Sequence, residues 1–185
     1  MHTNLLATLA NMSNHFKQLS PYVCEKITTL FKRLSKRFKK LLVQVNENHN
    51  GTSVDQSDAR SDADSDMMSV YSPDIVNDLS IYEEVLRMIL EIVNACLAAK
   101  LNRNPNLVYT LLYNRDIFEP FQEHPSFQDI VVNIESVLTY FSNRVDAENK
   151  ESDISVNEVY QIIQQAALQW PSDKLKVRIQ LKSAQ

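Results

Sequence analysis

The sequence predicts an all-α protein, an antiparallel stack of about five or six helices of armadillo or HEAT-like helical-repeat character. Three observations support this fold class. The 185 residues include a single glycine, Gly51, so the chain lacks the positions that glycine-rich phosphate loops, nucleophile elbows and tight β-turns require. Apolar residues recur every three or four positions over most of the chain. Several of these periodic segments begin with helix-capping sequences.

Residues 1–45 are expected to form an N-terminal pair of amphipathic helices. The first is a short helix from Asn4 to Phe16. The second begins at Ser20-Pro21, an N-cap followed by proline at the first helical position. Its apolar stripe runs over about six turns and is the clearest periodicity in the chain. The stripe comprises Val23, Ile27, Leu30, Phe31, Leu34, Phe38, Leu41, Leu42 and Val45.

Residues 46–72 are predicted to be a disordered acidic linker. They are rich in Asn, Asp and Ser and contain the only glycine. Because they offer little apolar surface to bury, nothing offsets the entropy lost on ordering. Ser-Asp pairs at Ser57, Ser61 and Ser65 resemble a phosphorylation tract, but a solvated linker is the favoured interpretation.

Residues 73–170 are predicted to form a helical domain. Its first helix starts either at Ser72-Pro73 or at the capping box of Ser80 and Glu83, and the sequence does not choose between them. A second helix starts at Asn104-Pro105. The short connections favour antiparallel neighbours, although the sequence has no strict repeat period that would prove a solenoid.

The C-terminal third continues the helical pattern and then changes period. A long amphipathic helix is expected from Phe127 to Val145. The capping box of Ser155 with Glu158 starts another helix, which ends at Trp170-Pro171 because the residue before proline is disfavoured in the α region. In residues 171–185, apolar and polar residues alternate as in a half-buried strand. This tail either docks as an extended arm or lacks the element with which it pairs.

The basic half of the second helix is the strongest candidate for a binding surface. Its cations lie mostly opposite Phe31 and Phe38, a composition that suits anionic lipid. The alternative is a solvated face on a core helix, which is favoured because one apolar stripe cannot be buried in protein and lipid at once. Nucleic acid is not expected, because the net charge is −4 and the basic face has no aromatic row. The candidate contacts are Lys32, Arg33, Lys36, Arg37, Lys39 and Lys40.

A turn between Pro120 and Pro125 is the second candidate. Aromatic side chains exposed between prolines are expected to mark a contact with another protein. Beside Glu123, the histidine of this turn could act as a general base. The favoured role is that the histidine donates a hydrogen bond that ties down the turn. The candidate partner contacts are Phe118, Phe121, His124 and Phe127.

No constellation in the sequence indicates an enzyme. Cys24 and Cys96 lie in helical patterns without histidine partners, and we interpret both as buried thiols in a reducing compartment. The remaining histidines lack the spacing of zinc ligands. We therefore expect a binding or scaffold module without cofactor, metal or small-molecule substrate. No apolar run approaches the ~20 residues of a membrane-spanning helix.

Residues 104–144 resemble the C-terminal part of the dymeclin family. The most specific segment is His-Pro-Ser-Phe-Gln-Asp-Ile at 124–130. The similarity extends to residues 83–92, and residues 1–13 resemble an internal stretch of the family. The resemblance implies a cytoplasmic, helix-rich protein that associates peripherally with the Golgi apparatus. It also implies support of Golgi organisation and vesicle traffic through other proteins of that machinery, with no catalytic residues.

The chain departs from the family pattern in two respects. Family members are much longer and carry an N-terminal glycine for lipidation, where this chain has His2. They also continue into an aromatic-rich C-terminal segment. We therefore expect a fragment or a truncated gene model, whose tail has lost its packing partner. The second hypothesis for function is a membrane-surface module that binds anionic lipid through the basic helix 23–45.

Overall fold

The computed structural model describes residues 2–50, 73–148 and 154–170, and every regular element in these ranges is helical. This confirms the predicted all-α class. The predicted strand in 171–185 and most of the predicted linker lie outside the described residues. The α-helices are α1 (His2–Met12), α2 (Pro21–Asn50), α3 (Pro73–Lys100), α4 (Pro105–Leu112), α5 (Gln128–Glu148) and α6 (Val156–Gln169). The 3-10 turns are η1 (Ser13–His15), η2 (Leu101–Arg103), η3 (Arg115–Ile117) and η4 (Glu119–Phe121).

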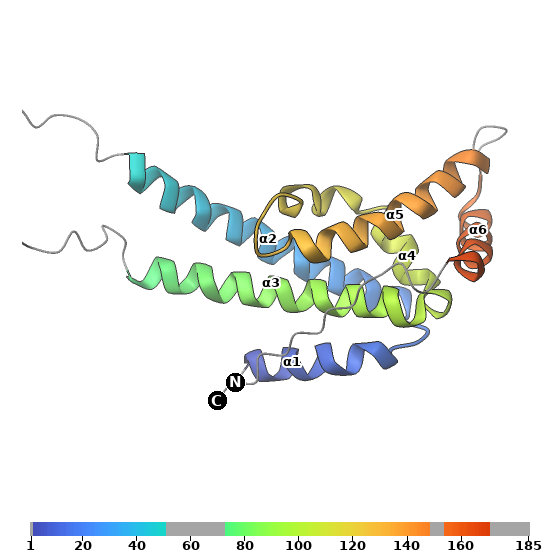
Figure 1. The fold of residues 1–185 in the computed structure, drawn as a ribbon, viewed down its shortest axis with the longest axis horizontal. Coiled ribbons are helices and arrows are strands. Elements are labelled where there is room, and N and C mark those ends of the chain that lie inside the picture. Colours follow the sequence, from blue (N-terminus) through green and yellow to red (C-terminus); the bar gives the residue numbers. More distant parts are fainter. Residues whose placement is uncertain (1, 51–72, 149–153, 171–185) are drawn as a thin grey trace, which may run out of the picture.

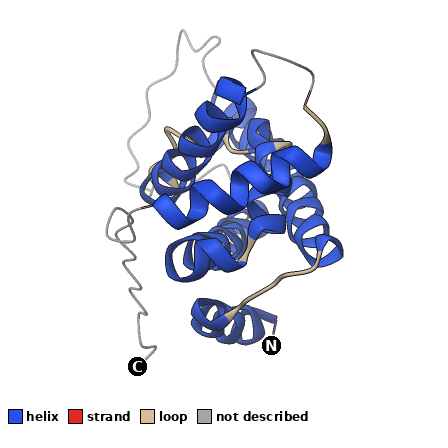
Figure 2. Ribbon diagram, turned by 90° about the vertical axis from the view of Figure 1, so that its right-hand side faces the viewer, coloured by secondary structure: helices blue, strands red, loops and turns tan. Residues whose placement is uncertain are grey.

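Helix α3 occupies the middle of the molecule and contacts α1, α2 and α5 (Figure 1). Helices α1 and α2 run antiparallel, as do α2 and α3, in agreement with the predicted antiparallel stack (Figure 1). Helix α6 closes one end against α4 and α5. In the perpendicular view, α1 lies at the edge of the stack (Figure 2). The α-helices have 11, 30, 28, 8, 21 and 14 residues, which gives no repeating unit, so the helical-repeat character is not confirmed.

The helix boundaries follow the capping residues more closely than the apolar periodicity. Ser20 accepts a hydrogen bond from the Val23 N–H at 3.4 Å, directly before the start of α2 at Pro21. The predicted end of this helix at residue 45 is wrong, since α2 continues to Asn50 and makes the first part of the predicted linker helical. Of the two predicted starts for α3, the structure has the earlier one, at Pro73.

The other boundaries lie close to the predicted ones, although α5 continues to Glu148, past the predicted end at Val145. The first predicted helix, 4–16, is α1 followed by the 3-10 turn η1. The capping box of α6 is present in full: the Glu158 N–H donates to Ser155 Oγ, and Glu158 Oε2 accepts from the Ser155 N–H at 2.6 Å. Helix α6 then ends at Gln169, directly before Trp170.

The core is built around the C-terminal half of α3. From Met88 to Leu97 every residue except Glu91 is buried, as expected of a helix with neighbours on several sides. Helix α2 contributes Phe31 and Phe38 to the same cluster. Burial of each such side chain favours the folded state by about 1.5–3 kcal/mol. No helix in the described part of the chain is long and apolar enough to cross a membrane.

One buried asparagine joins the connection after α1 to the junction between α3 and α4. The Asn104 Nδ2 donates to the carbonyls of Phe16 at 3.0 Å and of Cys96 at 3.4 Å. Its Oδ1 accepts the Leu19 N–H at 3.3 Å, and the neighbouring Asn106 donates to the Leu19 carbonyl at 2.8 Å. Because Asn104 is fully buried, these bonds satisfy groups that water cannot reach.

Candidate interaction surfaces

The turn between α4 and α5 that carries Phe118, Phe121, His124 and Phe127, which we term the aromatic turn, faces the core. The expectation that its rings are exposed is wrong, since Phe118, Phe121 and Phe127 are at most 1% exposed. They cannot form the predicted contact with a partner while the fold is intact. Of the four predicted contact residues, only His124 is partly accessible.

The burial of the turn has a specific cause in helix α2. The ring of Phe31 lies 5.4 Å from that of Phe121, and the ring of Phe38 lies 5.7 Å from that of Phe127 in an edge-to-face arrangement. Phe121 and Phe127 meet at 5.2 Å, almost perpendicular. Such pairs add about 0.5–1.5 kcal/mol beyond area burial. The turn is therefore the complement of the apolar stripe of α2, which explains why both are rich in phenylalanine.

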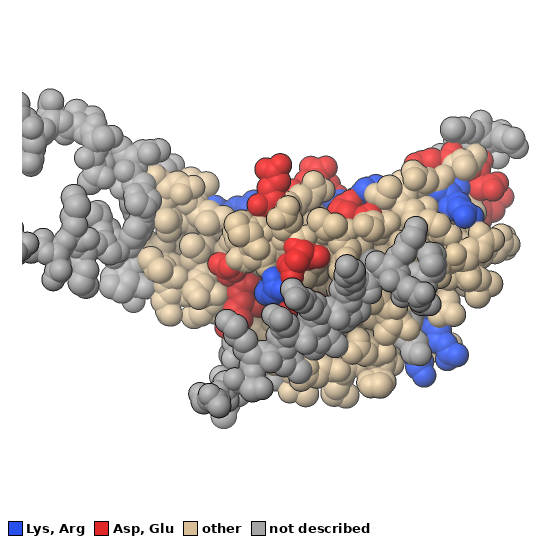
Figure 3. Space-filling model, viewed as in Figure 1, with Lys and Arg blue, Asp and Glu red and all other residues tan. Residues whose placement is uncertain are grey.

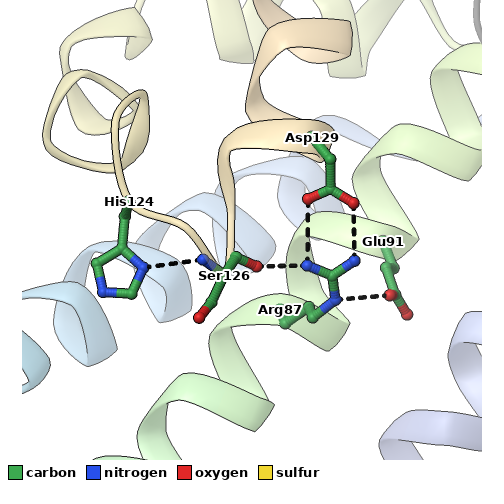
Figure 4. A network of polar contacts seen from close by, with 5 residues as sticks. All are labelled: Arg87, Glu91, His124, Ser126 and Asp129. Carbon is green, nitrogen blue, oxygen red and sulfur yellow. Dashed lines mark hydrogen bonds and ion pairs between the residues drawn. The ribbon is translucent and has the colours of Figure 1, made fainter.

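A polar network fixes the other side of this turn (Figure 4). The Ser126 N–H donates to His124 Nδ1 at 3.3 Å, so the imidazole ties down the turn as an acceptor. The Ser126 carbonyl in turn accepts from Arg87 Nη1 of α3. Arg87 also binds Asp129 in a bidentate manner and Glu91 through Nε at 3.3 Å. The favoured role of the histidine, a hydrogen bond within the turn, is present, although the ring accepts the bond.

The charges in this network shift the pKa values of its members. The hydrogen bonds from Arg87 hold the pKa of Asp129 below its usual range. Burial raises the pKa of Glu91, against the opposing effect of Arg87. The guanidinium keeps its proton, because its hydrogen bond to Asp129 raises the pKa of Arg87 further. The network thus holds a cation between two carboxyl groups of unequal acidity.

A third ion pair, between Arg115 and Glu135, lies beside an open depression on α5. Arg115 Nε donates to Glu135 Oε2 at 2.8 Å, and Arg115 Nη2 donates to Thr139 Oγ1 at 2.6 Å. The other carboxylate oxygen of Glu135 is buried without a hydrogen-bond partner among the described residues. The depression has a volume of about 440 Å³. It is lined by Gln122, Val131, Val132, Glu135, Ser136 and Thr139.

The structure exposes all of the predicted cationic contacts of α2. The packed part of the apolar stripe faces the core, as the favoured interpretation expected, and comprises Ile27, Phe31, Leu34, Phe38 and Leu42. Val23 and Leu30, which were predicted to belong to the same stripe, are exposed instead. This stripe cannot also enter a bilayer, so the membrane-surface hypothesis loses the apolar face that it needs. The exposed residues are Lys32, Arg33, Lys36, Arg37, Lys39 and Lys40.

Helix α1 offers an exposed surface of the opposite character. It contains no Lys, Arg, Asp or Glu, and where α1 is visible in Figure 3 its surface is drawn in tan. Leu5, Leu9 and Met12 are exposed with the spacing of one helix face.

No group of three His, Cys, Asp or Glu side chains that could hold a metal ion occurs among the described residues. Cys24 and Cys96 are buried free thiols, as predicted. Burial raises their pKa values to about 11 and about 12, which disfavours the nucleophilic thiolate.

Sequence reasoning missed the residues that connect elements far apart in the chain. Asn104 was assigned only as the start of a helix, and Arg87 and Asp129 only as part of a family resemblance. An arginine four residues before a glutamate suggests a pair within one helix, which the structure shows for Arg87 and Glu91. Nothing local indicates that the same arginine reaches Asp129, 42 residues away.

Together, the fold and these surfaces define an all-α helical protein. The sequence profile described as "Dymeclin: Dyggve-Melchior-Clausen syndrome protein" matches residues 1–183. The chain belongs to the dymeclin family, as the resemblance indicated.

Relatives named Dymeclin from Gallus gallus and Rattus norvegicus are 45% and 46% identical over 98% of this chain and 25% of their own length. The Drosophila melanogaster relative is 43% identical over 95% of this chain and 24% of its length. The chain therefore spans about a quarter of the length of these relatives. None of the three is named as an enzyme. No solved structure matches.

Proposed function

We propose that the chain acts as a non-enzymatic scaffold that supports Golgi organisation and vesicle trafficking through contacts with other proteins. The observation that carries this proposal is membership of the dymeclin family over residues 1–183. The expected location is the cytoplasm, with peripheral association at the Golgi apparatus, and the partners are proteins of the trafficking machinery.

The surfaces of the described residues support a role in protein contacts. Helix α1 presents aliphatic side chains without a charge, and α2 presents exposed cations in residues 26–40, which contain no Asp or Glu. Contact surfaces of both kinds need only a rigid support, which the shared core of α2, α3 and α5 provides. No cofactor or small-molecule substrate is part of the proposal.

A localisation experiment tests the proposal. The full chain, fused at its C-terminus to a fluorescent protein, is expressed in cells and compared with a Golgi marker. We expect enrichment at the Golgi that Tyr113→Ala, a change at an exposed position, leaves intact. Phe121→Asp, which places a charge in the core, should abolish the enrichment. A diffuse signal for the unaltered, folded chain would contradict the proposal.

A further inference from the structure

The outward face of α2 carries a run of cations that is uninterrupted by Asp or Glu in the sequence. Seven of the 19 Lys and Arg residues of the chain lie in 26–40, and none of the 23 Asp and Glu residues does. All seven side chains are exposed. The ion pairs among the described residues belong to Arg87 and Arg115 and involve none of these seven.

This arrangement is unfavourable for the isolated helix. Like charges four residues apart destabilise a helix by roughly 0.2–0.5 kcal/mol per pair. The pairs of this kind are Lys32 with Lys36, Arg33 with Arg37, and Lys36 with Lys40. An anionic partner would remove this repulsion, so the helix is complementary in charge to an acidic surface.

Apolar side chains lie among the cations. Leu30, which lies one turn from both Lys26 and Arg33, is 45% exposed. Tyr22 is 66% exposed, with Lys26 Nζ 5.0 Å from the centre of its ring. With 3.6 residues per turn, positions 22, 26, 30, 33, 37 and 40 form one outward row, which we term the α2 ridge.

We infer that the α2 ridge binds an acidic amphipathic helix of a partner protein. The carboxylates of that helix, spaced one per turn, would face the cations, and an aliphatic side chain would cover Leu30. This inference rests on the proposed role as a protein-contact scaffold and names the kind of partner. Electrostatic complementarity of this type fixes register and partner choice as well as affinity.

A protein helix fits the α2 ridge better than a bilayer does. An interfacial helix needs a wide apolar face to enter the lipid. In α2 that face, with Phe31 and Phe38, is in the protein core. Leu30 and Tyr22 alone interrupt the cations of the outward row, and such isolated apolar positions suit the side chains of a facing helix.

The test is fluorescence anisotropy with the purified full chain and a designed peptide of about 18 residues, enough to cover the roughly 21 Å between positions 26 and 40. The peptide carries glutamates one turn apart on one face with a leucine among them. We expect Arg33→Glu with Lys40→Glu to raise the Kd at least about 10-fold. The matched control, Lys17→Glu with Arg103→Glu, makes the same change in net charge at exposed positions elsewhere and should alter the Kd less than about 2-fold.

A second variant separates specific docking from attraction between net charges. Leu30→Ser should weaken binding of the designed peptide about 3-fold or more and leave a scrambled peptide of the same composition unaffected. Equal binding of both peptides would overturn the inference. So would equal losses in the two charge-reversed variants, or binding to phosphatidylserine vesicles without binding to the peptide. Because only purified components are used, a negative result here leaves the localisation experiment to decide the proposed function.

Discussion

The guanidinium of Arg87 on α3 holds the carboxylate of Asp129, in the first turn of α5, through two parallel hydrogen bonds. Nη1 lies 3.2 Å from Oδ1, and Nη2 lies 2.9 Å from Oδ2. The same guanidinium contacts the Ser126 carbonyl of the preceding turn. One side chain therefore sets the position of both the turn and the helix that follows it.

This pair predicts a pH-dependent contribution to stability. Since Arg87 lowers the pKa of Asp129, the contribution is present above the unfolded-state value of about 3.9 and is lost as the pH falls through the folded-state value. The side chains are 36% and 59% exposed, so solvent screening limits the contribution to about 1 kcal/mol or less. We expect Asp129→Asn to lower the free energy of unfolding by this amount at pH 7.

Urea denaturation between pH 2.5 and pH 7 checks this prediction. The difference between Asp129→Asn and the unaltered chain should shrink as the pH falls below about 3.9 towards the lowered pKa of Asp129. Glu123→Gln, at an exposed position of the same turn, should follow the unaltered chain throughout. A difference for Asp129→Asn that stays constant with pH would contradict the assignment.

Asn104→Ala should destabilise the fold strongly, although the change in side-chain volume is small. The change leaves the carbonyls of Phe16 and Cys96 and the N–H of Leu19 without this partner in a buried region. We expect a loss of about 2–4 kcal/mol in the free energy of unfolding. Asn102→Ala, two positions away and exposed, should change it by less than about 0.5 kcal/mol. Similar losses for both variants would refute the role assigned to Asn104.

Phe121→Ala tests the corrected placement of the aromatic turn. Its ring contacts Phe31, Phe38 and Phe127, so its removal should cost about 3–5 kcal/mol. Tyr113→Ala, at a position that is exposed, should cost much less. Chemical denaturation followed by circular dichroism measures both. If Phe121→Ala unfolds at the same urea concentration as the unaltered chain, the turn does not belong to the core.

The two thiols should be unreactive in the folded chain. Burial raises the pKa of Cys24 to about 11 and that of Cys96 to about 12, so at pH 8 almost no thiolate is present. An aromatic disulfide reagent should therefore label neither cysteine within minutes at pH 8 and both in urea. Rapid labelling of either cysteine under native conditions would show that this part of α2 or α3 opens readily.

Most of the helices could be predicted from the sequence because their signals are local. Proline after Ser20 and the capping box at Ser155 act within one turn, and the periodicity of Phe31 and Phe38 reports a buried face without naming its neighbour. The aromatic turn was misjudged for the same reason. Proline-flanked phenylalanines indicate a loop, but only the tertiary structure shows that the loop folds back onto α2.

The candidate surfaces were predictable in part. The cations of α2 were identified correctly as exposed, because the helical period places them opposite a strong apolar stripe. The C-terminal end of the helix was not predicted, because residues 46–50 are polar and resemble in composition the predicted linker. Contacts such as that of Arg87 with Asp129 depend on how α3 and α5 pack, and no spacing in the sequence encodes that distance.

The division of α2 into a core face and a contact face is the central claim, and one measurement tests it most directly. This is the free energy of unfolding of the full chain with Arg33→Glu and Lys40→Glu. The claim predicts a value within about 0.5 kcal/mol of the unaltered chain, or above it, because these surface charges repel their neighbours and support no packing. A loss of about 2 kcal/mol or more would show that the cations hold the fold together and would contradict their assignment as a contact surface.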